Sequence, residues 1–480
     1  MKTPFLLLCF LTVSLFSNAQ QWLDQKYTYD SVLNVSYGSS VNFIGDTETH
    51  LMDIYLPNCD DAAHLSTRPL LIFIHGGAFI AGDKDEANLQ TMCKQFAKRG
   101  YVTASIDYRL GFISDEIAHT CNFPSYNCVF ATDSLEWARA CYRSIQDGKG
   151  ALRYLINRHA QYRIDTNNVF LAGESAGSFV SLGVGLLDVP AEKFPEAFAA
   201  ASVPAPNANT SSCVYNVGKT FPATISRPDL GDIYGAIEPT TISYTIKGIG
   251  NFYGGMMHDL LQQSDPSKPK PAIYSFHQPC DMVVPIDSAK IYAGLSWCMT
   301  NGYGCYGIAN TPKVYGSRGL SNLNTNNSYG YTLDNHFTAT NFPYSFLIGA
   351  GSCADQVNNP CHAYDNFGAR LNELAGFFAP LVSTNPICDT AQVPVGLSQL
   401  ELERDLAIFP NPAAESFTIR QLTFEQAQYA IFDMLGREIQ NGELKFGDNL
   451  IPVKSHLIGG TFLVSVSKNG IRSSRLLTIK

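Results

Sequence analysis

Residues 168–187 of the 480-residue chain read NVFLAGESAGSFVSLGVGLL. The apolar run Val169–Ala172 is typical of a strand buried on both faces of a parallel sheet, and Ala176–Leu187 is compatible with a helix. Between them, Gly173–Gly177 reads G-x-S-x-G, a sharp turn that exposes the Ser175 hydroxyl at the start of the helix. The segment predicts a strand, a tight turn and a helix with Ser175 as nucleophile; a chance match in a chain rich in glycine and serine is the alternative.

The same alternation of apolar runs and helix-like segments recurs along the chain. Short apolar runs, each predicted to be a strand, occur at Leu51–Leu56, Leu70–Ile74, Tyr101–Ile106, Phe198–Val203 and Ala272–Phe276. Segments with a helical pattern occur at Asn88–Arg99, Gly148–His159 and Phe367–Phe378. Strand–helix–strand is the unit of a parallel sheet, so we expect the α/β class with a mostly parallel central sheet. The segment from Asn207 to about Lys270 looks irregular and is expected to form a cap or loop region over a site.

A glycine-rich motif, HGGAF at His75–Phe79, directly follows the run Leu71–Ile74. Acyl transfer passes through a tetrahedral oxyanion, which must be met by preorganised N–H donors, and small residues allow the backbone to come close. We expect the donors to be the backbone N–H groups of Gly77, Ala78 and Ala176. An ordinary glycine-rich turn after a strand is the alternative.

A catalytic serine needs a base, and the base needs an orienting carboxylate. In enzymes built around such a turn, the order along the chain is serine, acid, histidine. Asp281 is the expected acid, since it follows the strand Ala272–Phe276. Its rival Asp287 is expected instead to cap a helix over Ser288–Leu295.

The base is expected to be His362, which lies just before the predicted helix Phe367–Phe378. The rival His336 follows a loop-rich stretch with no clear strand. Two further residues beside the motifs are interpreted as structural. Glu174 is read as a buried carboxylate rather than an auxiliary acid, and His75 as a support for the glycine-rich loop.

On these residues, the segment from about Met52 to Pro380 resembles the carboxylesterase/lipase branch of the α/β-hydrolases. HGGAF is similar to that branch's HGGGF, with Ala78 in place of the third glycine, and GESAG at Gly173–Gly177 is its usual turn. Ser105–Leu110 and Asp147–Leu152 also match. The resemblance implies hydrolysis of carboxylic esters through an acyl-enzyme, with no metal and no cofactor.

The N-terminus has the pattern of an export signal. Lys2 precedes the apolar run Phe5–Phe16, which is too short to span a bilayer, and cleavage is expected after Ala19. An N-terminal anchor is the alternative. We expect no membrane-spanning segment in the mature chain.

Thirteen cysteines are present, and Cys9 lies in the signal, which leaves an even 12 in an exported chain. Disulfides are therefore expected. Close pairs are Cys121 with Cys128, Cys298 with Cys305, and Cys353 with Cys361, although closeness does not establish pairing. Zinc is the rival interpretation, but no CxxC pair occurs.

The tail has no cysteine and an all-β pattern. Strands are expected at Ser416–Arg420, Tyr429–Asp433, Thr461–Val466 and Arg475–Ile479, with a hairpin turn at Asn469-Gly470, in a small sandwich-like module. With FPNP at Phe409–Pro412 and FDMLGR at Phe432–Arg437, it resembles the C-terminal sorting domain of the type IX secretion system. An adhesive or carbohydrate-binding module is the alternative.

The expected organisation is a signal peptide over residues 1–19, a hydrolase domain over 20–389, a linker over 390–404 and a sorting domain over 405–480. With 33 basic and 42 acidic residues and no basic stripe, nucleic acid is not an expected partner. The expected partners are an ester substrate, polymeric or small, and the type IX machinery, which implies a released or cell-surface product.

The predicted function is therefore a secreted serine ester hydrolase acting on polysaccharide-linked or other short-acyl esters. A polyester hydrolase or lipase-like enzyme is the nearest alternative. A serine peptidase of similar fold is disfavoured because those usually carry a large N-terminal propeller. A non-catalytic binding protein on a hydrolase scaffold is the alternative from another class.

Overall fold

The computed structural model describes residues 22–58, 67–113, 134–204, 219–262, 265–292, 311–338, 361–383, 405–433, 437–453, 459–468 and 471–479. The chain divides into two compact units. The first comprises Met1–Ala363 and Ala375–Ala391, and the second comprises Tyr364–Leu374 and Gln392–Lys480. The expected signal peptide and the linker at 390–404 lie outside the described residues.

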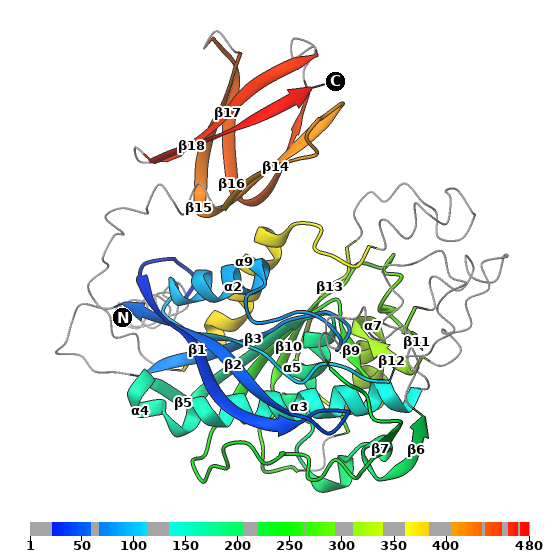
Figure 1. Ribbon diagram of the computed structural model, residues 1–480. Helices are drawn as coiled ribbons and strands as arrows, with labels where there is room; N and C mark the ends of the chain where they lie inside the picture. Colours follow the sequence, from blue (N-terminus) through cyan, green and yellow to red (C-terminus); the bar gives the residue numbers. More distant parts are fainter. Residues whose placement is uncertain are drawn as a thin grey trace, which may run out of the picture. The chain divides into compact units, whose positions relative to one another are not determined.

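The first unit is built on an eight-stranded sheet in the order β1-β2-β4-β3-β5-β8-β10-β13 (Figure 1). Its strands are β1 Thr28–Val41, β2 Thr47–Asn58, β3 Arg68–Ile74, β4 Val102–Ile106, β5 Ile164–Glu174, β8 Ile246–Phe252, β10 Ala272–Phe276 and β13 Leu333–His336. From β4 to β13 all neighbouring strands are parallel, whereas β2 is antiparallel to β1 and β4. The mostly parallel central sheet predicted from the sequence is confirmed.

Helices lie on both faces of this sheet. The helices of this unit are α2 Ala87–Ala97, α3 Ser134–Asn157, α4 His159–Tyr162, α5 Ala176–Leu186 and α7 Ser317–Asn326, with short 3-10 turns η3 Pro190–Glu192, η4 Pro195–Ala197 and η9 Ala379–Leu381. The helix α9 Phe367–Phe378 begins in the second unit and ends in the first. In Figure 1, α2 lies on one face, and α3 and α5 lie on the other. The α3–α5 contact needs glycine, because a Cβ on Gly183 would come within 2.2 Å of the Ile145 side chain.

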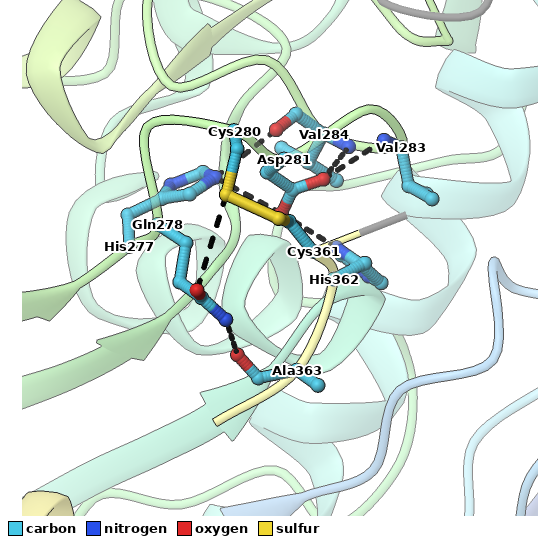
Figure 2. The surroundings of a disulfide bond; sticks show 9 residues. All are labelled: His277, Gln278, Cys280, Asp281, Val283, Val284, Cys361, His362 and Ala363. Atoms are coloured by element: carbon cyan, nitrogen blue, oxygen red, sulfur yellow. Dashed lines mark hydrogen bonds and ion pairs between the residues drawn. A yellow bond between two sulfur atoms is a disulfide. The ribbon is translucent and has the colours of Figure 1, made fainter. Parts of the chain in front are cut away.

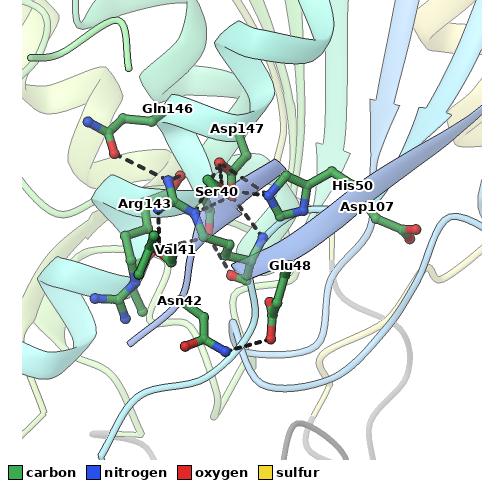
Figure 3. Close-up of polar contacts among 12 residues, drawn as sticks. Ser40, Val41, Asn42, Glu48, His50, Asp107, Arg143, Gln146 and Asp147 are labelled. Carbon is green, nitrogen blue, oxygen red and sulfur yellow. Dashed lines mark hydrogen bonds and ion pairs between the residues drawn. The ribbon is translucent and has the colours of Figure 1, made fainter. Parts of the chain in front are cut away.

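Two motifs that resemble the carboxylesterase/lipase branch, Ser105–Leu110 and Asp147–Leu152, are joined by a buried ion pair (Figure 3). Arg109, in the loop after β4, places Nε 2.8 Å from Oδ2 of Asp147 on α3. Its Nη1 also donates to the Val41 carbonyl at 2.8 Å, which ties in the end of β1. Burial opposes ionisation of Asp147, but Arg109 and then His50 outweigh it, so the pKa of Asp147 lies below its ordinary value.

One strand of the central sheet was not expected from the sequence. β8 lies between β5 and β10, within the segment from Asn207 to about Lys270 that the sequence predicts to be an irregular cap or loop region. Its sequence, IKGIGNF, interrupts the apolar run with glycines and polar residues. Packing requires at least one of these glycines: a Cβ on Gly248 would come within 2.8 Å of the Phe378 ring. The glycines that allow β8 to pack against the Phe378 ring therefore also interrupt the apolar pattern by which a strand is recognised in the sequence.

Two other local predictions need correction. The strand near Phe198–Val203 exists as β6 Ala200–Pro204, but it pairs with β7 Thr224–Arg227 in a separate two-stranded sheet. The helix expected from Ser288 is wrong, because Ser288–Lys290 forms β11. This strand pairs with β12 Lys313–Gly316, which in turn pairs with β9 Gly255–Met256. Non-local pairing thus overrides the local helical pattern there.

The second unit contains a five-stranded antiparallel sheet. Its strands are β14 Leu406–Phe409, β15 Ser416–Phe432, β16 Glu438–Pro452, β17 Gly460–Lys468 and β18 Ile471–Ile479. Two strands predicted separately, at Ser416–Arg420 and Tyr429–Asp433, are the two ends of β15, whose pairing with β16 shifts register between Gln421 and Gln426. The all-β tail is confirmed; the predicted turn Asn469-Gly470 lies outside the described residues.

Candidate active site

The turn at Ser175 joins β5 to α5 and has the strained geometry that its sequence predicts. Ser175 has φ 53° and ψ −122°, a conformation that residues with a side chain rarely adopt. Its N–H donates to the Phe252 carbonyl at 2.9 Å, at the end of β8. Both flanking glycines are required, because a Cβ on Gly173 would lie 2.2 Å from the Gly177 carbonyl oxygen, and one on Gly177 would lie 2.1 Å from the Ile74 oxygen. The Ser175 side chain remains partly accessible to solvent.

The structure brings Ser175, His362 and Asp281 together from three distant parts of the chain. His362 Nε2 lies 2.7 Å from Ser175 Oγ, and His362 Nδ1 lies 2.7 Å from Asp281 Oδ2. Asp281 follows β10 and His362 precedes α9, the positions expected from the sequence. Such a chain of contacts allows the ring to accept the serine proton while the carboxylate holds the ring orientation.

Asp281 is fully buried and is held by several donors. The N–H groups of Val283 and Val284 donate to its Oδ1 at 2.8 and 2.9 Å. His277, whose Nε2 lies 3.2 Å from Oδ2, contacts the same oxygen as His362. Burial opposes ionisation of Asp281, but the neighbouring His362 and the hydrogen bonds outweigh it, so its pKa lies below the ordinary value. His277 was missed in the sequence because nothing marks a buried histidine just after a strand as part of a site.

The two rival residues have other partners. Asp287 forms a two-bond ion pair with Arg318, with distances of 2.6 and 2.5 Å, instead of capping a helix. His336 ends β13, where its Nε2 lies 3.2 Å from Asp334 Oδ2 and its ring packs against Tyr274.

The loop at His75–Phe79 follows β3 and turns sharply beside Ser175. Gly77, Ala78 and Phe79 have φ values of 97°, 54° and 63°, so three successive residues are in the left-handed region. A Cβ on Gly77 would lie 2.1 Å from the Ala81 oxygen, and one on Gly76 would lie 3.2 Å from Ser175 Cβ. This backbone therefore comes close to the serine, where its N–H groups and that of Ala176 can serve as oxyanion donors.

Tyr108 holds this loop in place through its backbone carbonyls and through the His75 ring. Its hydroxyl lies 3.0 Å from the His75 carbonyl and 3.1 Å from the Gly76 carbonyl, and the two oxygens share its single O–H hydrogen. The His75 ring stacks on Tyr108 with centroids 4.2 Å apart. Burial lowers the pKa of His75 to about 4, so the ring is neutral near pH 7. The geometry agrees with a structural role for His75 rather than a role as base.

Glu174 lies in a small acidic network next to the nucleophile. The Tyr253 hydroxyl donates to Glu174 Oε2 at 3.0 Å, and the Tyr253 ring packs edge-on against His362 at 4.9 Å. Burial, and then the Glu174 carboxylate, raises the pKa of Glu86 to about 7. Glu174 is itself buried, and it holds the Tyr253 hydroxyl while the Tyr253 ring contacts the ring of the base.

A disulfide joins Cys280 to Cys361 (Figure 2). Cys361 thus pairs with a residue 81 positions away and not with its sequence neighbour Cys353. Cys93 and Cys141 are buried and free, so an even number of cysteines did not imply complete pairing. The other two close pairs, Cys121 with Cys128 and Cys298 with Cys305, lie outside the described residues.

Within the described ranges, no group of three or more His, Cys, Asp or Glu side chains could hold a metal ion. In that same part of the chain, every helix is too short or too polar to cross a bilayer.

Two family models match parts of the chain. Residues 52–120 and 135–210 match the family described as BD-FAE, an α/β-hydrolase esterase domain. Residues 407–480 match the family described as "Secretion system C-terminal sorting domain". The chain carries a carboxylesterase-type α/β-hydrolase domain and a type IX sorting domain. The matched part of the hydrolase domain includes the His75–Phe79 loop and Ser175, but not Asp281 or His362.

The chain also resembles curated relatives over a short length. It is 28% identical over 137 residues to isoprenylcysteine alpha-carbonyl methylesterase of Arabidopsis thaliana, covering 28% of this chain and 25% of that protein. It is 29% identical over 135 residues to phenmedipham hydrolase of Pseudarthrobacter oxydans, covering 28% of this chain and 22% of that protein. The chain thus spans about a quarter of the length of these relatives.

Two solved structures also align with the chain. One is a truncated carbohydrate esterase from gut microbiota, with 15% identity and a TM-score of 0.39, covering 75% of this chain and 98% of that one. The other is esterase B from Lactobacillus rhamnosis, with 14% identity and a TM-score of 0.36, covering 78% and 93%.

Proposed function

We propose that this protein is an exported serine esterase that hydrolyses carboxylic esters through an acyl-enzyme on Ser175. The observation that carries the proposal is the pair of 2.7 Å contacts that link Ser175 to His362 and His362 to Asp281. Membership of the hydrolase family supports an ester as the substrate. The sorting domain supports export by the type IX machinery, with release or attachment at the cell surface.

The proposed reaction begins when His362 Nε2 accepts the proton of Ser175 Oγ as that oxygen attacks the ester carbonyl. Asp281 stabilises the imidazolium that forms and keeps Nδ1 protonated. The N–H groups of Gly77, Ala78 and Ala176 donate to the oxyanion, and one such donor contributes about 10²–10³ to kcat. His362 then protonates the leaving alcohol, and water activated by the same ring hydrolyses the acyl-enzyme.

The proposed substrates are short-acyl esters, in particular those carried by polysaccharides. Two features support this choice. Ala78 adds a methyl group to the oxyanion loop where the HGGGF motif has glycine, and we expect this methyl to leave less room for the acyl group. Export brings the enzyme to polymers that do not enter the cell.

The test is a Ser175→Ala variant assayed with p-nitrophenyl acetate. We expect kcat/KM to fall by about 10⁴-fold, because nucleophile and base act as a unit, while the unfolding transition is retained. Ser181→Ala is the matched control, since Ser181 is a buried serine on α5, the helix that follows Ser175. A fluorophosphonate probe should label the wild type at Ser175. Hydrolysis that survives in Ser175→Ala would contradict the proposal, and a wild type that neither labels nor hydrolyses would favour a binding-only scaffold.

The substrate class is tested with a separate panel. We expect acetyl esters to be hydrolysed faster than butyryl and octanoyl esters, and acetate to be released from acetylated xylan. Methyl ferulate and a polyester film complete the panel, and preference for either over acetyl esters would contradict the short-acyl proposal.

A further inference from the structure

We infer that the disulfide Cys280–Cys361 sets the distance between the acid and the base, so that its two cysteines are positioning residues for the proposed hydrolysis. Cys280 directly precedes Asp281, and Cys361 directly precedes His362. The covalent bond and the 2.7 Å contact between His362 and Asp281 therefore join the same two loops at consecutive residues (Figure 2). This inference rests on the proposed function.

The two loops differ in how firmly the rest of the fold holds them. The acid loop follows the central strand β10 directly, and Asp281 accepts hydrogen bonds from the N–H groups of Val283 and Val284. His277, four residues before Asp281, is fully buried and places Nδ1 2.9 Å from Ser317 Oγ. The acid thus has a fixed scaffold of its own.

The base loop has fewer anchors of this kind in the described part of the chain. There, the His362 side chain makes its hydrogen bonds to Ser175 and Asp281, the other two members of the proposed triad. In the described residues, Gln278 adds one further link between the loops, since its Nε2 donates to the Ala363 carbonyl at 2.8 Å. A productive site requires its side chains to be held within about 0.5 Å. We attribute this precision to the covalent link.

The backbone at Cys361 gives a second reason. Cys361 has φ 56°, in the left-handed region that residues with a Cβ rarely adopt. The chain turns at this residue, so its conformation sets the direction in which the next side chain, His362, leaves the backbone. The bond to Cys280 anchors Cys361 in that conformation.

Exposure decides how the link can be tested. Cys280 is partly exposed, whereas the free thiols of Cys93 and Cys141 are buried and burial raises the pKa of each. We therefore expect a thiol reductant to attack the bond from the side of Cys280, since Cys361 is buried.

The first experiment compares the full-length wild type with the double variant Cys280→Ser/Cys361→Ser on p-nitrophenyl acetate. We expect kcat to fall at least tenfold with KM changed less than twofold, and fluorophosphonate labelling of Ser175 to slow in parallel. Circular dichroism should show the same secondary structure. Cys141→Ala is the matched control and should keep the wild-type kcat. An unchanged kcat, or a change in KM alone, would overturn the inference.

The second experiment uses the wild-type sequence. It therefore tests the inference even if the double variant does not fold. Dithiothreitol converts the disulfide to two thiols and becomes a cyclic disulfide itself, and peptide mapping verifies the reduction of Cys280 and Cys361. We expect kcat to fall to the level of the double variant, to recover on reoxidation with oxidised glutathione, and to stay constant when the double variant is treated. Full activity with both thiols free, or a loss that reoxidation leaves in place, would overturn the inference. A wild type with no Ser175-dependent hydrolysis would instead contradict the proposed function.

Discussion

Arg109 and Asp147 lie 38 residues apart in the chain, and Arg109 Nε lies 2.8 Å from Asp147 Oδ2 in the interior of the first unit. The Arg109 N–H also donates to Oδ2, at 2.9 Å, and Nη2 donates to the Arg143 carbonyl at 3.1 Å. Ser40 Oγ donates to Asp147 Oδ1 at 3.2 Å. One ion pair therefore joins β1, the loop after β4 and the helix α3.

This pair predicts a large loss of stability when one partner is removed. Asp147→Asn leaves the Arg109 charge buried and uncompensated, so we expect the free energy of unfolding to fall by about 3–5 kcal/mol. Arg318→Ala is the control, because Arg318 and Asp287 form a pair with side chains 44% and 52% exposed. Its loss should be below about 1 kcal/mol. Urea unfolding of both variants is the measurement, and equal small losses would contradict the prediction.

The Tyr108 hydroxyl predicts a loss of activity in addition to a loss of stability. Tyr108→Phe leaves the carbonyls of His75 and Gly76 without this donor, so the loop that carries the proposed oxyanion donors can shift. We expect kcat for p-nitrophenyl acetate to fall about tenfold and stability to fall by about 1–3 kcal/mol.

The matched control is Tyr142→Phe, which removes a single hydrogen bond to the Gly231 carbonyl, 3.0 Å long. It should cost similar stability and leave kcat unchanged. If both variants lost the same fraction of activity, Tyr108 would have no special connection to the site.

The features predicted correctly have short-range signals in the sequence. The turn at Ser175 and the loop at His75–Phe79 combine glycines with neighbouring buried strands, so a few residues were enough to identify them. Asp281 and His362 could be chosen because each borders a clear element, β10 or α9. Their roles remain predictions that the variants above test.

The features that were missed depend on contacts between distant residues. The strand β8 contains glycines that only its neighbours explain, and β11 pairs with a strand more than 20 residues later. The Cys280–Cys361 bond joins residues 81 positions apart. The sequence does contain a signal for this pairing, because each of the two cysteines directly precedes a candidate catalytic residue. The spacing between cysteines alone does not indicate it.

Glu86 predicts a dependence of stability on pH. Burial, and then the Glu174 carboxylate, raises its pKa from 4.5 to about 7. Between these values the native state keeps a proton that the unfolded state has lost, so the stability contributed by protonated Glu86 is full below about pH 4.5 and falls as pH rises to about 7.

Glu86→Gln removes this dependence. Relative to the wild type, the variant should gain about 1 kcal/mol between pH 5 and pH 8, a modest value because solvent screens the partly exposed side chain. Urea unfolding midpoints at the two pH values provide the measurement. The exposed Asp30, changed to Asn, is the control and should show no such gain. A constant difference between Glu86→Gln and wild type at both pH values would be inconsistent with the shift.

Gly177 predicts a sharp steric limit at the turn that carries the nucleophile. A Cβ there would lie 2.1 Å from the Ile74 oxygen and 2.5 Å from the His75 oxygen. Both are backbone atoms where β3 enters the oxyanion loop, so they give way only if the loop moves. We expect Gly177→Ala to lose about 3 kcal/mol of stability and more than 100-fold in kcat/KM.

Gly376→Ala is the control, because among the described residues a Cβ at this exposed position of α9 meets nothing within 4 Å. It should gain about 0.5–1 kcal/mol and keep full activity, because alanine is the better helix former. Comparable losses in the two variants would show that the effect at Gly177 is not the steric one described.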